Sequence, residues 1–172
     1  MGSIAPIQEV TRILRILLET QMEMIGVEIS SAPLDLLSDQ KVKRINLYLY
    51  ELKENPGIRN QPIPNTNSPV TPSPLPLNLN YLLTPFLKTI EYDKDYDIKI
   101  QELLSNAINV FHNNSLIKIP TDLQNQIESL RILLNPLDTK ELIEIWKGFK
   151  VPYRLSVAYS VTAVFKNNHI KS

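Results

Sequence analysis

The sequence predicts an α+β fold, with a single mostly antiparallel (mixed) sheet, about three flanking helices and a long proline-rich loop. Three observations support this class. Apolar residues recur at helical spacing in three separate segments, they alternate with a period of two in several others, and seven of the thirteen prolines fall between Pro62 and Pro85. A length of 172 residues suits one domain, so we expect residues 1–172 to form one unit with residues 166–172 as a flexible tail.

Three segments have the apolar periodicity of helices that bury one face. The first spans residues 4–24, with Ser3 as its expected N-cap and Gly26 as its stop. The second follows the acidic residues 92–97 and ends at Asn113–Asn114. The third is capped by Asp138 or Thr139 and turns Leu142, Ile145, Trp146 and Phe149 inward.

Strands are expected where apolar and polar residues alternate. These segments are a short one at 27–29, then 42–52, 75–83, 116–119, 127–134 and 153–165. In the 42–52 strand, Ile45, Leu47 and Leu49 face one side, whereas Asn46, Tyr48, Tyr50 and Leu52 face the other. Both faces are largely apolar, so the strand lies centrally or has its second face covered. We expect the helices to pack on one face of the sheet.

Residues 58–74 form a loop rich in proline. Proline removes backbone donors and favours extended polyproline geometry. A loop of this length without secondary structure is uncommon in a compact domain and usually has a function. The strand that follows contains Pro76, which is confined to the strand start or to an edge.

Composition excludes several classes of function. Eighteen lysines and arginines balance eighteen aspartates and glutamates, so binding to nucleic acid through phosphate charge is not expected. There is no cysteine, which rules out disulfides, thiolate metal sites and cysteine nucleophiles. No apolar run is long enough to span a membrane, and the first residues lack a secretory pattern. The chain is therefore expected to stay in the cytosol unless an assembly carries it out.

No catalytic, metal-binding or cofactor-binding pattern is visible. His112 and His169 have no ligand-spaced partner, and His112 is expected to end a helix. Residues 93–97 resemble the start of a calcium loop, but Ile98 replaces the required glycine and Leu104 the required glutamate. Trp146 is expected in the core. Arg154 could pair with an acid across the sheet or protect a strand edge, and the sequence does not choose between these.

Several stretches, taken in order, resemble one family. They are Ile7–Thr11, Asn46–Tyr50, Glu54–Pro56 with Arg59–Asn60, Leu75–Thr84, and Trp146 followed by Tyr153–Tyr159. Together they resemble the cap, or tail-terminator, proteins of phage-tail-like extracellular contractile injection systems, in their N-terminal cap domain. The resemblance covers about residues 4–165. Some relatives carry a further C-terminal region, which this sequence does not extend into.

The resemblance implies a structural protein and no enzyme. Such caps form a hexameric ring that ends the inner tube and joins it to the last sheath ring, so the implied partners are copies of itself, the tube protein and the sheath protein. It implies cytoplasmic assembly in a bacterium, within a particle that is either released or membrane-anchored, without direct membrane insertion. The contact residues that we expect are Tyr50, Arg59, Asn60, Pro62, Pro64 and Arg154.

Two other functions stay open at this stage. Residues 61–76 could dock as a polyproline ligand in an aromatic groove, which would make the chain an adaptor. A hydrolase using two carboxylates is also conceivable, although no acidic pair is visible in the sequence.

Overall fold

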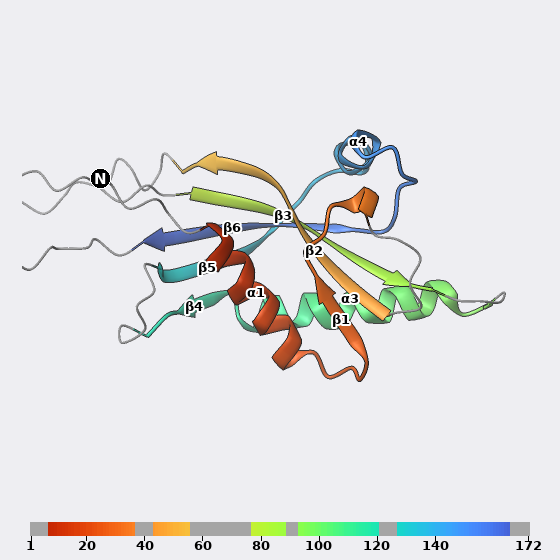
Figure 1. The fold of residues 1–172 in the computed structure, drawn as a ribbon, viewed down its shortest axis with the longest axis horizontal. Helices are drawn as coiled ribbons and strands as arrows, with labels where there is room; N and C mark the ends of the chain where they lie inside the picture. Colours follow the sequence, from red (N-terminus) through yellow and green to blue (C-terminus); the bar gives the residue numbers. More distant parts are fainter. Residues whose placement is uncertain (1–6, 37–42, 56–76, 89–92, 121–126, 166–172) are drawn as a thin grey trace, which may run out of the picture.

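The computed structural model describes residues 7–36, 43–55, 77–88, 93–120 and 127–165. Within these ranges a curled sheet lies between helices (Figure 1). In chain order the elements are α1 (Ile7–Gln21), β1 (Val27–Ser30), the 3-10 turn η1 (Leu34–Leu36), β2 (Lys43–Glu54), β3 (Leu77–Leu87), α3 (Tyr96–Asn113), β4 (Leu116–Lys118), β5 (Ile127–Asn135), α4 (Thr139–Gly148) and β6 (Val157–Phe165). These elements confirm the predicted α+β class.

The sheet has six strands in the order β1-β2-β3-β6-β5-β4. Only β1 and β2 are parallel, and the other neighbours are antiparallel, so the sheet is mixed but mostly antiparallel as predicted. The long strands β3 and β6 form its centre. Because β1 and β4 are short, much of β2 and part of β5 have no strand on their outer side within the described residues.

One face of the sheet carries the main core, covered by α1 and α3 (Figure 1, below the sheet). Buried side chains from both helices meet alternate residues of four strands, including Leu47, Tyr81, Ile132 and Val161. Phe111 of α3 packs edge-on against Tyr159, with 5.0 Å between ring centroids. Apolar residues repeat every 3.6 positions in the helices and every second position in the strands, so each element has one apolar face. These faces meet in the main core, as the sequence predicted.

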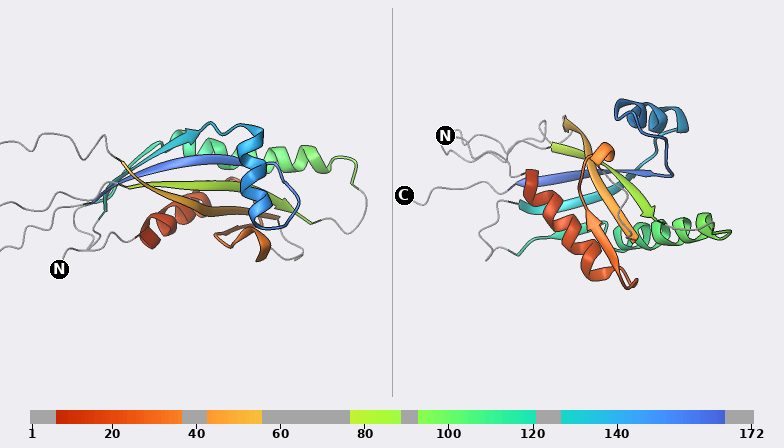
Figure 2. Two further views of the ribbon diagram at one scale, coloured as in Figure 1. Left: turned by 90° about the horizontal axis from the view of Figure 1, so that it is seen from above. Right: turned by 45° about the vertical axis from the view of Figure 1, so that its right-hand side comes forward.

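The opposite face carries a second, smaller core under α4 and η1. Leu34, Leu142 and Trp146 cover Leu82 and Ala158 of the two central strands. The expectation that all helices share one face was therefore wrong, and Figure 2 shows α4 set apart from α1 and α3. The reason is that β2 and β3 have apolar residues on both faces, and the second apolar face needs its own cover. The prediction that the second face of β2 is covered is confirmed.

A bulge in β2 corrects the expected alternation of this strand. Tyr50 is an extra residue in β2, since Leu49 pairs with Tyr81 and Glu51 pairs with the next residue, Asn80. This bulge shifts the alternation by one, so Leu52 lies opposite Leu79 on the main-core face and not beside Tyr50 as expected. Alternation alone cannot reveal an inserted residue.

Two predicted element boundaries also moved. The first helix ends at Gln21, and Gly26, with φ of 77°, forms the turn before β1. The last strand begins at Val157 and not at Tyr153, because Ser156 bonds to Trp146 and Thr84 and holds the preceding segment against the α4 layer. Asp138, one of the two residues expected to cap α4, does so in a reciprocal capping box with Glu141, and Asn114 ends α3. The predicted N-cap Ser3 and the tail 166–172 lie outside the described residues.

Candidate functional site

The residues expected to make contacts fall into two groups. Arg59, Asn60, Pro62 and Pro64, like the whole of the expected 58–74 loop, lie outside the described residues and remain predictions. Tyr50 and Arg154 are described, and they lie in different places on the α4 side of the sheet. The structure therefore shows the end of β2, the start of β3 and how two of the expected contact residues are held.

A polar cluster lies where β2 ends and β3 begins, which we name the loop base: Glu51, Lys53, Asn55, Asn78, Asn80 and Thr162. Asn78 is its centre. Its Oδ1 accepts hydrogen bonds from Asn55 Nδ2 at 3.1 Å and from Thr162 Oγ1 at 2.8 Å. Asn55 directly follows β2, so these bonds tie the residue after β2 to the central strands β3 and β6.

The loop base continues along β2. Asn80 donates to Glu51 Oε2 at 2.8 Å, and Lys53 Nζ lies 3.0 Å from the same oxygen. The bond from Lys53 is the main cause that lowers the pKa of Glu51, and the bond from Asn80 adds to it. Asn80 Oδ1 is buried without a hydrogen-bond partner in the described part of the chain. The sequence signal for this cluster is the pair of asparagines, Asn78 and Asn80, at alternate positions of a mostly apolar strand.

Tyr50 projects from the β2 bulge toward the second core and is half-buried. Its hydroxyl accepts a hydrogen bond from Asn135 Nδ2 at 3.1 Å, which links β2 to the end of β5 across the sheet. Burial is the largest cause of its raised pKa. Tyr50 thus has a structural partner of its own, and its role as a contact residue stays a prediction.

Arg154 lies in the segment between α4 and β6, with its guanidinium 4.9 Å from the ring centre of Phe86. It therefore has neither of the roles considered from the sequence, since it is not on a strand and stacks on an aromatic ring. A guanidinium over a ring face keeps its N–H groups available at the ring edge. On either side of it, Tyr153 and Leu155 are 42% and 44% exposed. The prediction that Trp146 is a core residue is confirmed, since it is 1% exposed.

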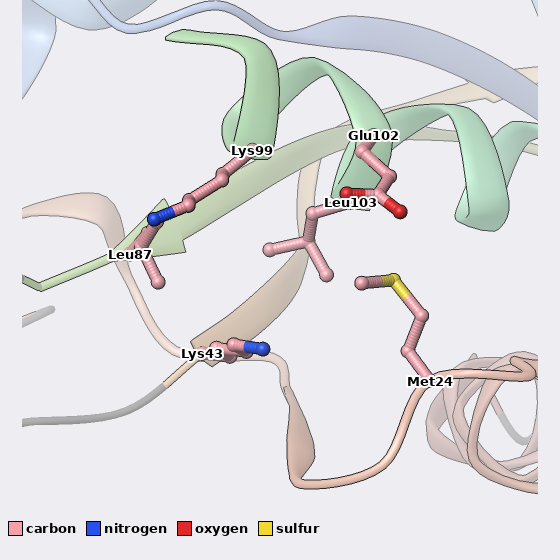
Figure 3. A pocket seen from close by; sticks show the side chains of 6 residues that line it. All are labelled: Met24, Lys43, Leu87, Lys99, Glu102 and Leu103. Atoms are coloured by element: carbon pink, nitrogen blue, oxygen red, sulfur yellow. The ribbon is translucent and has the colours of Figure 1, made fainter. Parts of the chain in front are cut away.

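A small pocket lies on the other side of the molecule, between α3, the start of β2, the end of β3 and the turn after α1 (Figure 3). Its volume is about 150 Å³. Met24, Leu87 and Leu103 form its apolar walls, and Lys43, Lys99 and Glu102 line it as well. With one carboxylate, this pocket does not supply the acidic pair that the hydrolase reading requires.

Within the described ranges, no group of three or more histidine, cysteine, aspartate or glutamate residues could hold a metal ion. Asp93, the first residue of the calcium-like stretch, bonds to Lys99 Nζ at 2.6 Å and to the backbone N–H of Asp95. The bond from Lys99 is the largest cause that lowers the pKa of Asp93. His112 lies in the last turn of α3, as predicted. A search of the described residues found no helix with the length and apolar character needed to cross a membrane.

Comparison with known proteins identifies the family. The Pvc16 N-terminal domain family matches residues 9–170, which is nearly the whole chain. The chain belongs to the Pvc16 N-terminal domain family. No curated protein matches it. The resemblance drawn from the sequence motifs is thereby confirmed.

Two solved structures share the fold of this Pvc16 N-terminal domain. One is the sheath/tube terminator of PVC, an extracellular contractile injection system, in its extended state, with a TM-score of 0.62 and 19% identity over 99% of this chain. The other is the tube-terminating cap of the anti-feeding prophage, with a TM-score of 0.62 and 18% identity over 96% of this chain. This chain spans 60% and 59% of the lengths of those two proteins.

Proposed function

We propose that this protein is a structural cap of a contractile injection system, which forms a hexameric ring, ends the inner tube and joins it to the last sheath ring. One observation carries the proposal: the family match spans residues 9–170, and both named structures of the same fold are terminators of such particles. Assembly in the bacterial cytoplasm and a later place in a released or anchored particle belong to the same proposal.

The sheet offers a physical basis for such a role. Residues 47–53 of β2 have no neighbouring strand on their outer side in the described part of the chain, because β1 pairs only with residues 43–46. An open edge can accept an extended segment through main-chain hydrogen bonds, with side-chain contacts on alternate residues. The bulge at Tyr50 interrupts this edge and limits how far a copy of the same strand could extend it. We therefore expect the edge of β2 to accept one strand of a partner and not to start a repeated addition of strands.

The loop base supports a role of the 53–74 region in contact with the tube or a neighbouring subunit. Hydrogen bonds through Asn78 and Asn80 fix both strands from which the loop departs. A contact loop anchored on rigid strands loses less conformational freedom on binding than a freely moving one. Within this proposal Tyr50, Arg59, Asn60, Pro62 and Pro64 are loop-side contact residues, and Arg154 is a contact on the opposite end of the sheet.

The test compares tubes assembled with the native protein and with a variant lacking residues 61–73. We expect the variant to stay folded, because β2 and β3 on either side of the deleted segment pair directly with each other, and to be absent from tube ends in electron micrographs. A second variant, with the same segment replaced by glycine and serine at equal length, separates loss of chain length from loss of contacts. If both variants give tubes of normal length with normally occupied ends, the loop is not a contact that the cap needs.

The alternative function, an adaptor that binds a partner through residues 61–76, leads to a different prediction. A peptide of residues 61–76 would then capture its partner without assembled tubes, whereas the cap proposal requires tube ends. Absence of the native protein from the ends of assembled tubes, together with such capture, would replace the cap proposal with the adaptor.

A further inference from the structure

We infer that half of the sheet face opposite the main core binds an acidic amphipathic helix of a protein other than this chain. The surface, which we name the open half-face, consists of Leu116, Lys118, Arg131, Leu133, Ser160 and Thr162. It shares no residue with the expected loop or with the outer edge of β2. The inference therefore goes beyond the proposed function and does not depend on it.

The open half-face continues the face that carries the second core. Thr162 and Ala158 are four residues apart on β6 and so share a face, and Ala158 belongs to the second core. Arg131 of β5 lies between Thr162 and Leu116 of β4. The described helical elements of this face, α4 and η1, lie over its other half, to the right in Figure 1. Leu116 and Leu133 are accordingly 53% and 51% exposed.

The centre of the open half-face is an exposed cation with uncharged neighbours. Leu116 and Thr162 flank Arg131 across the sheet, and Ser129 and Leu133 are the next residues of β5 on the same face. Arg131 forms no ion pair in the described residues. A guanidinium has five N–H donors in a fixed fork that matches a carboxylate. The surface around Arg131 therefore favours a partner that brings a carboxylate.

Two carboxylates of the chain lie on or beside this part of the sheet. Glu51 of β2 is already held by a lysine and an asparagine of the loop base. Glu128 lies at the bulge of β5, next to the residue opposite Lys118, and forms no ion pair with Lys118 or Arg131. Lys118 is therefore a second exposed cation, and the charge of the open half-face is complementary to an acidic partner.

The dimensions of the open half-face suit one helix. Neighbouring strands are about 4.8 Å apart and alternate residues about 7 Å apart, so three strands and three rows of residues measure about 10 by 14 Å. A helix is about 10 Å across, and about nine of its residues span 14 Å. A partner on this face must bond its own backbone groups, because those of the sheet are paired within the sheet, and a helix does so. Leu116 and Leu133 can contact apolar residues three or four positions apart on it.

A second copy of this chain does not offer such a helix among its described residues. The apolar stripes of α1, α3 and α4 are buried in the two cores. Their large exposed apolar residues are Ile16 on α1 and Ile98 on α3, so each of these two helices has one and α4 has none. A single residue cannot contact both leucines. Nucleic acid is also a poor fit, because two cations beside leucines make few phosphate contacts and the net charge of the chain is zero.

The experiment measures binding of a fluorescent peptide to the full chain by anisotropy. The peptide has about 18 residues, which is long enough for a stable helix, with leucines at three- and four-residue spacing and glutamates beside them. One matched peptide has lysines in place of the glutamates, and another has the same composition with the spacing scrambled. The acidic peptide should bind about tenfold more tightly than either of them.

Variants of the chain locate the binding surface. Arg131→Glu and Leu133→Ser should each weaken binding of the acidic peptide by about tenfold or more, and Arg131→Glu should bind the lysine peptide more tightly than the native chain does. The matched controls outside the open half-face are Lys43→Glu, at an exposed lysine without an ion pair in the described residues, and Leu155→Ser, at a leucine that is 44% exposed. Both controls should bind like the native chain, and circular dichroism checks that all four variants fold.

Three results would overturn the inference: no binding of the acidic peptide up to about 1 mM, equal binding of the lysine or scrambled peptide, or unchanged binding by Arg131→Glu and Leu133→Ser. Displacement of the acidic peptide by a lower concentration of a single-stranded oligonucleotide would assign the surface to phosphate. Self-association that both variants abolish would assign it to a second copy, and either outcome also overturns the inference. The assay contains no tubes, so its failure leaves the proposed cap in place, and a chain absent from tube ends leaves this inference in place.

Discussion

Replacing Tyr81 with phenylalanine should change the stability of the domain in opposite directions at neutral and at alkaline pH. Tyr81 is fully buried in the main core, and its hydroxyl shares a 2.9 Å hydrogen bond with Thr11 of α1. These residues come from two of the stretches that carry the family resemblance, and their bond joins the N-terminal helix to the central strand β3. Burial raises the pKa of Tyr81 to about 12, although the bond from Thr11 opposes this.

The magnitude has two parts. At about pH 8 the phenylalanine variant loses a hydrogen bond and leaves the Thr11 hydroxyl unpaired, which costs about 1 kcal/mol. Since the pKa of Tyr81 rises on folding from 10.0 to about 12, its stabilising effect is complete below pH 10 and is lost as the pH rises toward 12. The native protein should lose about 1.4 kcal/mol from this group by about pH 11 and about 2 kcal/mol by pH 12.

The phenylalanine variant has no phenol that ionises at position 81, so its free energy of unfolding should fall less steeply as the pH rises. It should equal that of the native protein near pH 11. The assay is urea unfolding followed by the fluorescence of Trp146, which is the only tryptophan in the chain. Differences between the two proteins at each pH remove the contributions of the other tyrosines and of the lysines. Thr11→Val is the control: it removes the hydrogen bond but keeps the buried phenol, so the alkaline loss should persist. A constant difference between native protein and Tyr81→Phe from pH 8 to pH 11 would refute the reasoning.

Four further outcomes are expected. Asn46 is fully buried and bonds to Ser30 Oγ and to both backbone groups of Ala32, so Asn46→Ala should cost about 3 kcal/mol in urea unfolding. Asp138→Ala removes the capping box of α4 and should cost about 1 kcal/mol, with faster hydrogen exchange confined to α4. Trp146→Phe removes the 3.3 Å bond to Ser156 and part of the second core, and thermal unfolding should show a loss of about 2 kcal/mol. Because the pKa of Glu51 is lowered in the folded state, its ionised form stabilises the fold above the unfolded value of 4.5, and this stabilisation is lost as the pH falls. The loss should be a few tenths of a kcal/mol, since solvent screens an ion pair whose side chains are 61% and 38% exposed, and Glu51→Gln should remove this acid dependence in urea unfolding.

Much of the fold follows from local sequence patterns. Each of the six observed strands and three observed helices lies where apolar periodicity placed it, with boundaries shifted by a few residues. The cap of α4 was also predictable, because a capping box depends on residues three apart in the sequence. The family motifs, taken together in their order along the chain, were sufficient to identify the family, although no single stretch decides it.

The loop base and the β2 bulge were not predictable in the same way. The sequence shows Asn78 in a strand, but its hydrogen bonds come from Asn55 and Thr162, and the second is 84 residues away. Likewise, Tyr50 looks like one more residue of a regular alternation, and only pairing with β3 shows that it is inserted. The placement of α4 on the second face depended on which strands became neighbours in the sheet.

The sequence alone determined the elements, the family and the absence of any cysteine chemistry, because these depend on residue types and on spacings of a few positions. Tertiary structure decided the partner of Arg154, the second core and the residues that line the pocket beside α3. These depend on contacts between residues far apart in the chain, and such contacts are fixed only when the strands adopt their register and each apolar face finds its cover.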